Sequence, residues 1–124
     1  MGAHCHVSEL TAVRAHKPPH NRDIVVLSSP FCPRASQAFA SGITYLEPGK
    51  VHEVHAHEVE EFVYILKGSG ICEFCGETFR FRPGTVLQAN SMEPHGFTND
   101  GNETVEILWV TSPAGRERAF LKQE

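Results

Sequence analysis

The sequence predicts an all-β domain, either an antiparallel sandwich or a barrel, and three observations support this prediction. From residue 36 onward, short segments rich in Val, Ile, Phe, Tyr and Thr alternate with turns that contain Gly or Pro. Segments of this length at this spacing are typical of β-sandwiches and barrels. Helical periodicity is almost absent from the chain. With 124 residues, the chain is long enough for one domain with one hydrophobic core.

We expect three regions along the chain: an irregular N-terminal arm over residues 1–35, a barrel over 36–113 and a C-terminal tail over 114–124. The arm is rich in proline and contains one strand-like run, Ile24–Leu27. The expected strands of the barrel are residues 37–47, 51–55, 61–67, 70–75, 78–82, 85–89, 95–98 and 103–111.

The segment Phe62–Leu66 is apolar on both faces of its expected strand. One face must point into the barrel, and the other face must also be covered. The run Ile24–Leu27 needs cover as well, and a partner chain is the simplest source for both. We therefore expect a homodimer, because an exposed apolar strand in a monomer promotes aggregation.

The charge and hydropathy of the chain exclude several classes of function. A formal net charge of -4, with 11 Lys and Arg spread along the chain, gives no basic stripe for nucleic acid. No run approaches the roughly 20 apolar residues of a membrane-spanning helix. The first 20 residues have no continuous apolar segment, so we expect no secretory signal and a cytoplasmic protein with reduced thiols.

Cys72 and Cys75 form a CxxC motif where an expected strand runs into a turn. A redox pair would instead stand at the start of a helix. We interpret the motif as one core thiol and one turn thiol. The alternative, a zinc site shared with Cys5 and Cys32, lacks the second CxxC that such sites usually have.

Four residues in the barrel region have the spacing of a transition-metal site. His55 and His57 lie near the end of an expected strand, where residues i and i+2 project to the same face, roughly 6.6–7 Å apart. Glu61 opens the next expected strand and His95 opens a later one, so their side chains can face the same interior point. We therefore expect His55, His57, Glu61 and His95 to bind one divalent metal ion.

The four candidate ligands limit which metal ions can bind and which small molecules can bind beside the metal. Three imidazoles and one carboxylate suit Fe, Mn, Zn, Ni or Cu, whereas Ca prefers oxygen ligands. A divalent ion beside one carboxylate leaves a site charge of about +1, which favours a small anionic or chelating molecule. Four protein ligands leave about two positions of an octahedral shell open, which is typical of catalytic sites.

His55, His57 and Glu61 lie in a segment that resembles a motif of the cupin superfamily. The series Gly49-(five residues)-His55-x-His57-(three residues)-Glu61-(six residues)-Gly68 matches the first cupin motif at every fixed position. The resemblance covers about residues 36–113. It implies a double-stranded β-helix, or jelly-roll barrel, that is usually homodimeric and holds the metal inside one end.

A second motif resembles that of the family with one departure. Gly76 is followed by Pro94-His95-(three residues)-Asn99, which makes His95 the metal histidine and Asn99 the closing asparagine. Where the family has Pro-x-Gly before this histidine, the chain has Asn90-Ser91-Met92. The departure affects the expected shape of the turn and of the pocket mouth more than it affects the ligand.

Other residues are candidates for the pocket. Gln88 interrupts an apolar segment, and it either points inward to bind a ligand or points outward. His52, three residues before His55, is expected on the opposite face of the strand and exposed. Further residues that either line the pocket or belong to the plain core are Tyr45, Val63, Ile65, Met92, Phe97 and Trp109.

Two functions from different classes fit the sequence. Cupins that resemble this chain include dioxygenases, sugar isomerases, polyketide cyclases and sulfonium lyases; the lyases carry a tyrosine where this chain has Val63. The first hypothesis is a metalloenzyme whose ion acts as a Lewis acid or binds dioxygen. The second is a cupin that binds or stores a small ligand without turning it over. We favour the enzyme. A cupin that acts as a sensor is usually attached to a DNA-binding domain, and we expect no room for such a domain beside the barrel in these 124 residues.

Overall fold

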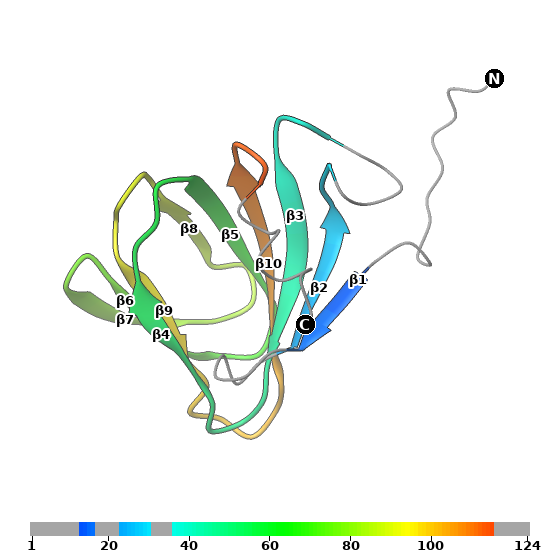
Figure 1. Ribbon diagram of the computed structural model, residues 1–124. Coiled ribbons are helices and arrows are strands. Elements are labelled where there is room, and N and C mark those ends of the chain that lie inside the picture. The colour runs from blue at the N-terminus through cyan, green and yellow to red at the C-terminus, as the bar shows by residue number, and fades with distance from the viewer. Residues whose placement is uncertain (1–12, 17–22, 31–35, 116–124) are drawn as a thin grey trace.

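The computed structural model describes residues 13–16, 23–30 and 36–115, which form ten β-strands and no helix (Figure 1). The all-β prediction is therefore confirmed, and these residues contain no helix that could cross a membrane. The strands are β1 Val13–His16, β2 Asp23–Ser28, β3 Ala40–Leu46, β4 Val51–His55, β5 Glu60–Lys67, β6 Gly70–Phe74, β7 Glu77–Phe81, β8 Val86–Ala89, β9 His95–Thr98 and β10 Val105–Ser112.

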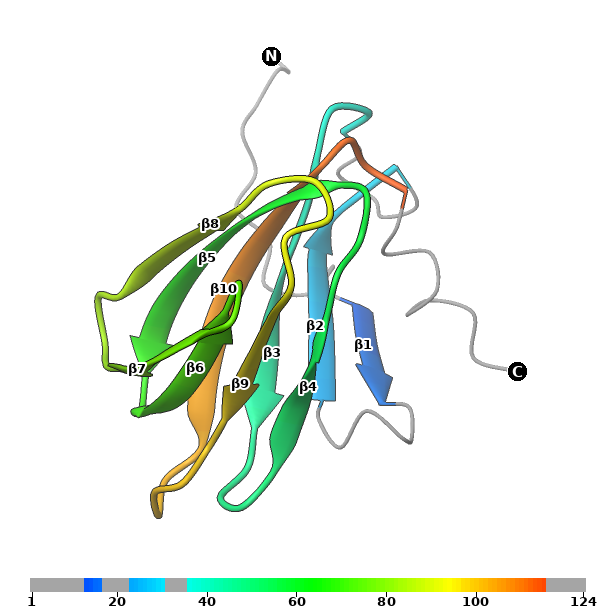
Figure 2. The same ribbon diagram turned by 90° about the vertical axis from the view of Figure 1, so that its left-hand side faces the viewer.

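The strands form two antiparallel sheets that face each other, as the two views in Figures 1 and 2 show. One sheet has six strands in the order β1-β2-β3-β10-β5-β8, and the other has four in the order β4-β9-β6-β7. Neighbours that are distant in sequence, such as β3 and β10, make this a jelly roll rather than a series of hairpins.

The N-terminal segment contributes two strands to the larger sheet. β2 pairs with β3, and β1 pairs with β2 at the edge of the sheet. Ile24 and Val26 are buried in a cluster with Ala40 and Trp109. The run Ile24–Leu27 therefore receives most of its cover from its own chain, and only Leu27 stays exposed. The boundaries at residues 36 and 113 stay a prediction.

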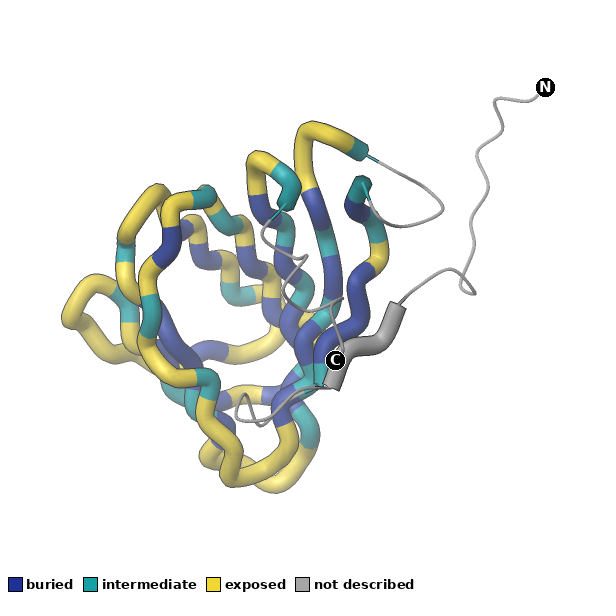
Figure 3. Tube along the Cα trace, viewed as in Figure 1, coloured by how far each residue is buried: buried dark blue, intermediate teal, exposed yellow. Residues whose placement is uncertain are grey.

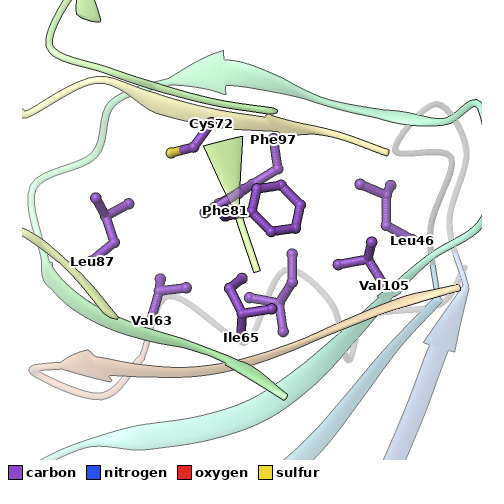
Figure 4. Packing of buried hydrophobic residues seen from close by; sticks show 9 residues of the cluster. Leu46, Val63, Ile65, Cys72, Phe81, Leu87, Phe97 and Val105 are labelled. Carbon is purple, nitrogen blue, oxygen red and sulfur yellow. The ribbon is translucent and has the colours of Figure 1, made fainter. Parts of the chain in front are cut away.

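The main core lies between the two sheets and is filled from both (Figure 4). Side chains alternate along each strand, so that one residue in two points inward. In Figure 3 the inward positions appear as a regular series of buried residues along the strands of the larger sheet. The core consists of Leu46, Val63, Ile65, Cys72, Phe81, Leu87, Phe97, Val105 and Ile107.

The outer face of the six-stranded sheet carries a partly exposed row of apolar residues. On β5, Phe62, Tyr64 and Leu66 point outward with 37%, 37% and 41% of their surface exposed. The strand register places apolar residues side by side across five strands of this face. This row consists of Val86, Tyr64, Leu108, Ile43 and Val25.

Candidate metal centre

The fold brings the three predicted histidines together at one end of the barrel. β4 ends at His55, which lies opposite His95 at the start of β9. His57 follows β4, in the loop that leads to β5, and is not on the strand as expected. The ligand atoms of His55, His57 and His95 all lie within 4.8 Å of one another. Two segments that are distant in sequence, the end of β4 with its following loop and the start of β9, thus place three imidazoles around one point.

Each of the three rings is oriented by a backbone carbonyl. In each ring, Nδ1 lies within hydrogen-bond distance of a carbonyl oxygen two residues away, which fixes the ring and leaves Nε2 toward the common point. The pairs are His55 with Glu53 at 3.0 Å, His57 with Val59 at 3.1 Å and His95 with Glu93 at 2.9 Å.

Glu61, the fourth predicted ligand, joins this cluster from β5. Its Oε1 lies 3.1 Å from Nε2 of His57 and 2.9 Å from Nε2 of His95. Burial by itself would raise the pKa of Glu61, but hydrogen bonds from these two histidines bring the pKa down to about 2. The carboxylate is therefore ionised at neutral pH, as a metal ligand must be.

The protonation state of His55 is set mainly by burial. Burial is the main cause that lowers its pKa from 6.5 to about 4; the hydrogen bond to the carbonyl of Glu53 acts against this shift, and the neighbouring His95 and His57 add to it. The ring is therefore neutral at pH 7, with a free lone pair on Nε2. Three oriented imidazoles and an ionised carboxylate fit a divalent transition metal.

His52 lies beside the cluster, which the sequence did not predict. The expectation of an exposed residue on the opposite strand face was wrong, because the register of β4 shifts between His52 and His55. The rings of His52 and His55 stack with centroids 4.7 Å apart and planes inclined by 10°. The ring of His52 also meets Phe97 edge-on, at 5.9 Å.

Gly96 makes this bulge possible. A Cβ atom at Gly96 would lie only 2.7 Å from the backbone nitrogen of Val54 and 2.8 Å from the carbonyl oxygen of His52. Only glycine lets the irregular part of β4 pack this closely on β9. The glycine directly after His95 is thus the one sequence signal that could have revealed the bulge.

The loop between β8 and β9 replaces the family's glycine with a strained methionine. Met92 has a φ of 64°, in the left-handed region that favours glycine. Its backbone N–H donates a 2.7 Å hydrogen bond to the carbonyl of His57. Within the same loop, Glu93 accepts from His95. The loop thereby connects the segments that carry two of the candidate ligands, His57 and His95.

The remaining pocket candidates divide into inner and outer positions. Gln88 points outward: it lies opposite Phe62 in the register and its amide reaches Asn90, so it does not line the interior. Side chains alternate along β8 and Leu87 is buried, so Gln88 points to the outer face. Val63, Ile65, Phe97 and Trp109 are buried inside, whereas Tyr45 lies on the outer face and Met92 is exposed in its loop.

The CxxC motif is split between the core and the surface, as expected. Cys72 is buried in β6, and burial raises its pKa to about 11. Cys75 is free and exposed in the following turn, and its pKa is also raised. Neither thiol has the lowered pKa of a redox cysteine. Cys5 and Cys32 lie outside the described residues.

Comparisons with known proteins agree with this fold. The chain is 32% identical over 92 residues to the polyketide synthase CurC of Streptomyces cyaneus, which covers 73% of this chain and 59% of that protein. It is 38% identical over 66 residues to an oxalate-binding protein of Thermotoga maritima, which covers 52% of this chain and 54% of that protein. The chain thus spans less than two thirds of the length of these two relatives.

A solved structure and a family model complete the comparison. The structure is a predicted oxalate decarboxylase from Thermotoga maritima, with a TM-score of 0.65 and 25% identity, and the match covers 85% of this chain and 94% of that one. The family model, described as Cupin domain, matches residues 42–111, which is more than half of the chain. The chain therefore belongs to the cupin family.

Proposed function

We propose that this cupin binds one divalent transition metal through His55, His57, Glu61 and His95, and uses it to hold a small molecule that chelates through oxygen. The single observation that carries the proposal is the common orientation of the three imidazoles. Each ring is fixed through Nδ1 by a carbonyl two residues away, and Oε1 of Glu61 lies between two of the Nε2 atoms. Such secondary contacts are typical of metal-binding histidines.

The surroundings of the site limit the chemical role of each residue in it. Glu61, with a pKa of about 2, acts as a charged ligand rather than as a general base. The apolar Val63 and Leu87 lie next along β5 and β8, and exclude water from the deep side of the site. When bound, the metal supplies Lewis acidity or a site for dioxygen.

Charge and similarity both support an anionic chelating ligand. A divalent ion beside one carboxylate leaves a charge of about +1, which attracts a small carboxylate or enolate. One relative is named as an oxalate-binding protein and another as a polyketide synthase. Oxalate and a β-diketone both offer two oxygens at chelating distance, so the two ligand classes share their chemistry.

Metal analysis and a ligand titration test this proposal. Elemental analysis of protein purified without a histidine tag should give about one transition metal per chain. Cobalt(II)-loaded protein should then change its visible spectrum on addition of oxalate or acetylacetone. If none of a panel of small chelating acids and diketones shifts the visible bands, the proposed ligand class is wrong.

The same titration separates an enzyme from a binding module. We propose an enzyme of the dioxygenase, isomerase or cyclase type, because the polyketide synthase relative supports chemistry at such a site. The alternative is a ligand-binding or storage cupin, which the oxalate-binding relative supports. Ligand that is bound and then recovered chemically unchanged, as followed by NMR, with and without oxygen, would favour the binding module.

We also propose that the chain forms a homodimer through the outer face of the six-stranded sheet. The apolar row from Val86 to Val25 crosses five strands without a charged residue. Tyr64 and Leu66, on the strand next to the β8 edge of the sheet, are 37% and 41% exposed. A partly exposed apolar row of this length is characteristic of an interface.

A further inference from the structure

Thr111 has a buried hydroxyl that bonds to nothing among the described residues. Among the buried side-chain nitrogen and oxygen atoms of the described residues, Oγ1 of Thr111 is the one without a hydrogen-bond partner. The residue as a whole is 6% exposed. An unsatisfied buried hydroxyl is costly, so its presence in a core strand calls for a functional explanation.

The strand register places Thr111 directly beside the metal centre. On β10 it lies opposite Glu61 of β5, and both side chains are on the inner face of the six-stranded sheet. Directly opposite residues on one face of an antiparallel pair have Cβ atoms about 4.5–5.5 Å apart. The hydroxyl therefore lies within one side-chain length of a predicted ligand, on the barrel side.

The inner row that contains Thr111 is built from small side chains. Glu61 is flanked by Ala89 on one side and by Thr111 on the other, and Ala40 follows on β3. One row deeper, β8, β5 and β10 carry the buried Leu87, Val63 and Trp109, and Gly42 lies opposite Trp109 on β3. Glu61 thus has smaller neighbours on β8 and β10 than Val63 has, and Thr111 is the uncharged polar residue of its row.

We propose that Thr111 is a specificity-determining residue, whose hydroxyl donates a hydrogen bond to an oxygen of the molecule bound at the metal. This inference rests on the proposed function and goes beyond it, since it names the group that orients the ligand from the β10 side. A bound carboxylate or enolate oxygen next to Glu61 is the acceptor that this hydroxyl lacks in the protein alone. Because the acceptor is charged, the bond is stronger than an ordinary neutral one.

The choice of side chain supports a polar role rather than a packing role. Val has nearly the same shape as Thr and would occupy the same position without an unsatisfied hydroxyl. The other inward residues of β10 are Val105, Ile107 and Trp109, all apolar and buried. The strand changes to a polar inward residue only where it reaches Glu61.

Two variants separate the hydroxyl from the shape of the residue. Thr111→Val keeps the shape and removes the hydroxyl, whereas Thr111→Ser keeps the hydroxyl and removes the methyl group. Wild type and both variants are loaded with cobalt(II), and oxalate and acetylacetone are titrated into each while the visible spectrum is followed. We expect all three proteins to bind cobalt(II) equally. We expect Thr111→Val to bind the ligand at least tenfold more weakly than wild type, and Thr111→Ser to stay within threefold.

The melting temperature of the metal-free proteins gives a second, independent measurement. Because the hydroxyl has no partner in the resting protein, Thr111→Val should melt at or above the temperature of wild type. A marked decrease in the melting temperature of Thr111→Val would show that the hydroxyl is already bonded, and would overturn the inference. Equal ligand affinity of Thr111→Val and wild type would overturn it as well.

Failure of the proposed function would be visible in the wild-type protein. If wild type binds cobalt(II) but none of the chelating ligands, the ligand class and the role of Thr111 are both wrong. If Thr111→Val loses cobalt(II) itself, the hydroxyl acts on the metal centre and not on the ligand, and only the inference about Thr111 is wrong.

Discussion

The imidazole rings of His52 and His55 lie stacked, with centroids 4.7 Å apart and planes inclined by only 10°. His55 also has its Nδ1 fixed by the carbonyl of Glu53 at 3.0 Å. The stack covers one face of the His55 ring, while the carbonyl contact fixes its edge. Together the two contacts restrict the direction in which Nε2 of His55 can point.

We predict that His52 positions His55 by stacking and does not bind the metal. His52→Ala removes the stack and should weaken metal affinity about tenfold, in the range typical of residues that support a ligand. His52→Phe keeps an aromatic ring without a nitrogen and should retain nearly the affinity of wild type. Competition with a chromophoric chelator measures both. Equal losses in His52→Phe and His52→Ala would show that an imidazole nitrogen of His52 is itself a ligand.

We predict that His57→Ala loses most of the bound metal while the barrel stays folded. The core of nine buried residues between the sheets, rather than the ion, should supply most of the stability. Elemental analysis and circular dichroism measure the two effects, with Gln88→Ala on the outer face as the control. Stoichiometric metal in His57→Ala would refute the ligand assignment, and complete unfolding would show that the metal is structural.

The metal-free protein should lose stability in acid, in two overlapping steps. The folded-state pKa of His55 is about 4, below its unfolded value of 6.5, so the unfolded chain binds more protons between these values. Stability is therefore complete above about pH 6.5 and falls as the pH is lowered toward 4. Glu61, with a folded-state pKa of about 2 against 4.5, adds a second loss below about pH 4.5.

Urea unfolding between pH 4.5 and 7.5 tests the contribution of His55. Its effect on the free energy of unfolding is limited to about 1.4 kcal/mol per pH unit, the maximum for one proton. His55→Gln should flatten the profile in this range, because glutamine does not titrate. Identical pH profiles for wild type and His55→Gln would contradict the prediction.

Met92→Gly should stabilise the protein by about 0.5 kcal/mol. A non-glycine residue in the left-handed region costs about 1–2 kcal/mol, and the greater flexibility of glycine in the unfolded chain offsets about 0.5–1 kcal/mol of this. Met92→Ala keeps the Cβ atom and hence the strain at a φ of 64°, so it is the matched control. Denaturant unfolding that shows no gain for Gly over Ala would mean that the loop carries no backbone strain.

Light scattering should give twice the 13.7 kDa mass of one chain at micromolar concentration. Tyr64→Lys places a charge within the apolar row of the outer face and should yield a monomer. Val51→Lys, at a residue 40% exposed on the other sheet, should stay dimeric. A monomeric wild type would rule out the proposed interface.

The sequence by itself determined the barrel strands and the cluster of candidate ligands of this protein. Alternating apolar residues between glycine and proline turns predicted eight barrel strands, and the structure has a strand in each of these places. The fixed spacing around His55, His57, Glu61 and His95 predicted the cluster that the fold brings together. Both predictions worked because they depend on local periodicity and on short spacings, which the sequence states directly.

Only the tertiary structure determined which face of a strand some side chains occupy and which residues of distant segments lie beside each other. A bulge in β4 places His52 on His55, although uniform alternation predicts opposite faces. Gln88 lies outside because its side is fixed by pairing with β5, and Thr111 became a candidate only when β10 was found beside Glu61. A single extra residue in a strand moves every later side chain to the opposite face, and the pairing of strands depends on segments far apart in sequence. Neither the bulge nor the pairing could therefore be derived from the order of residues alone.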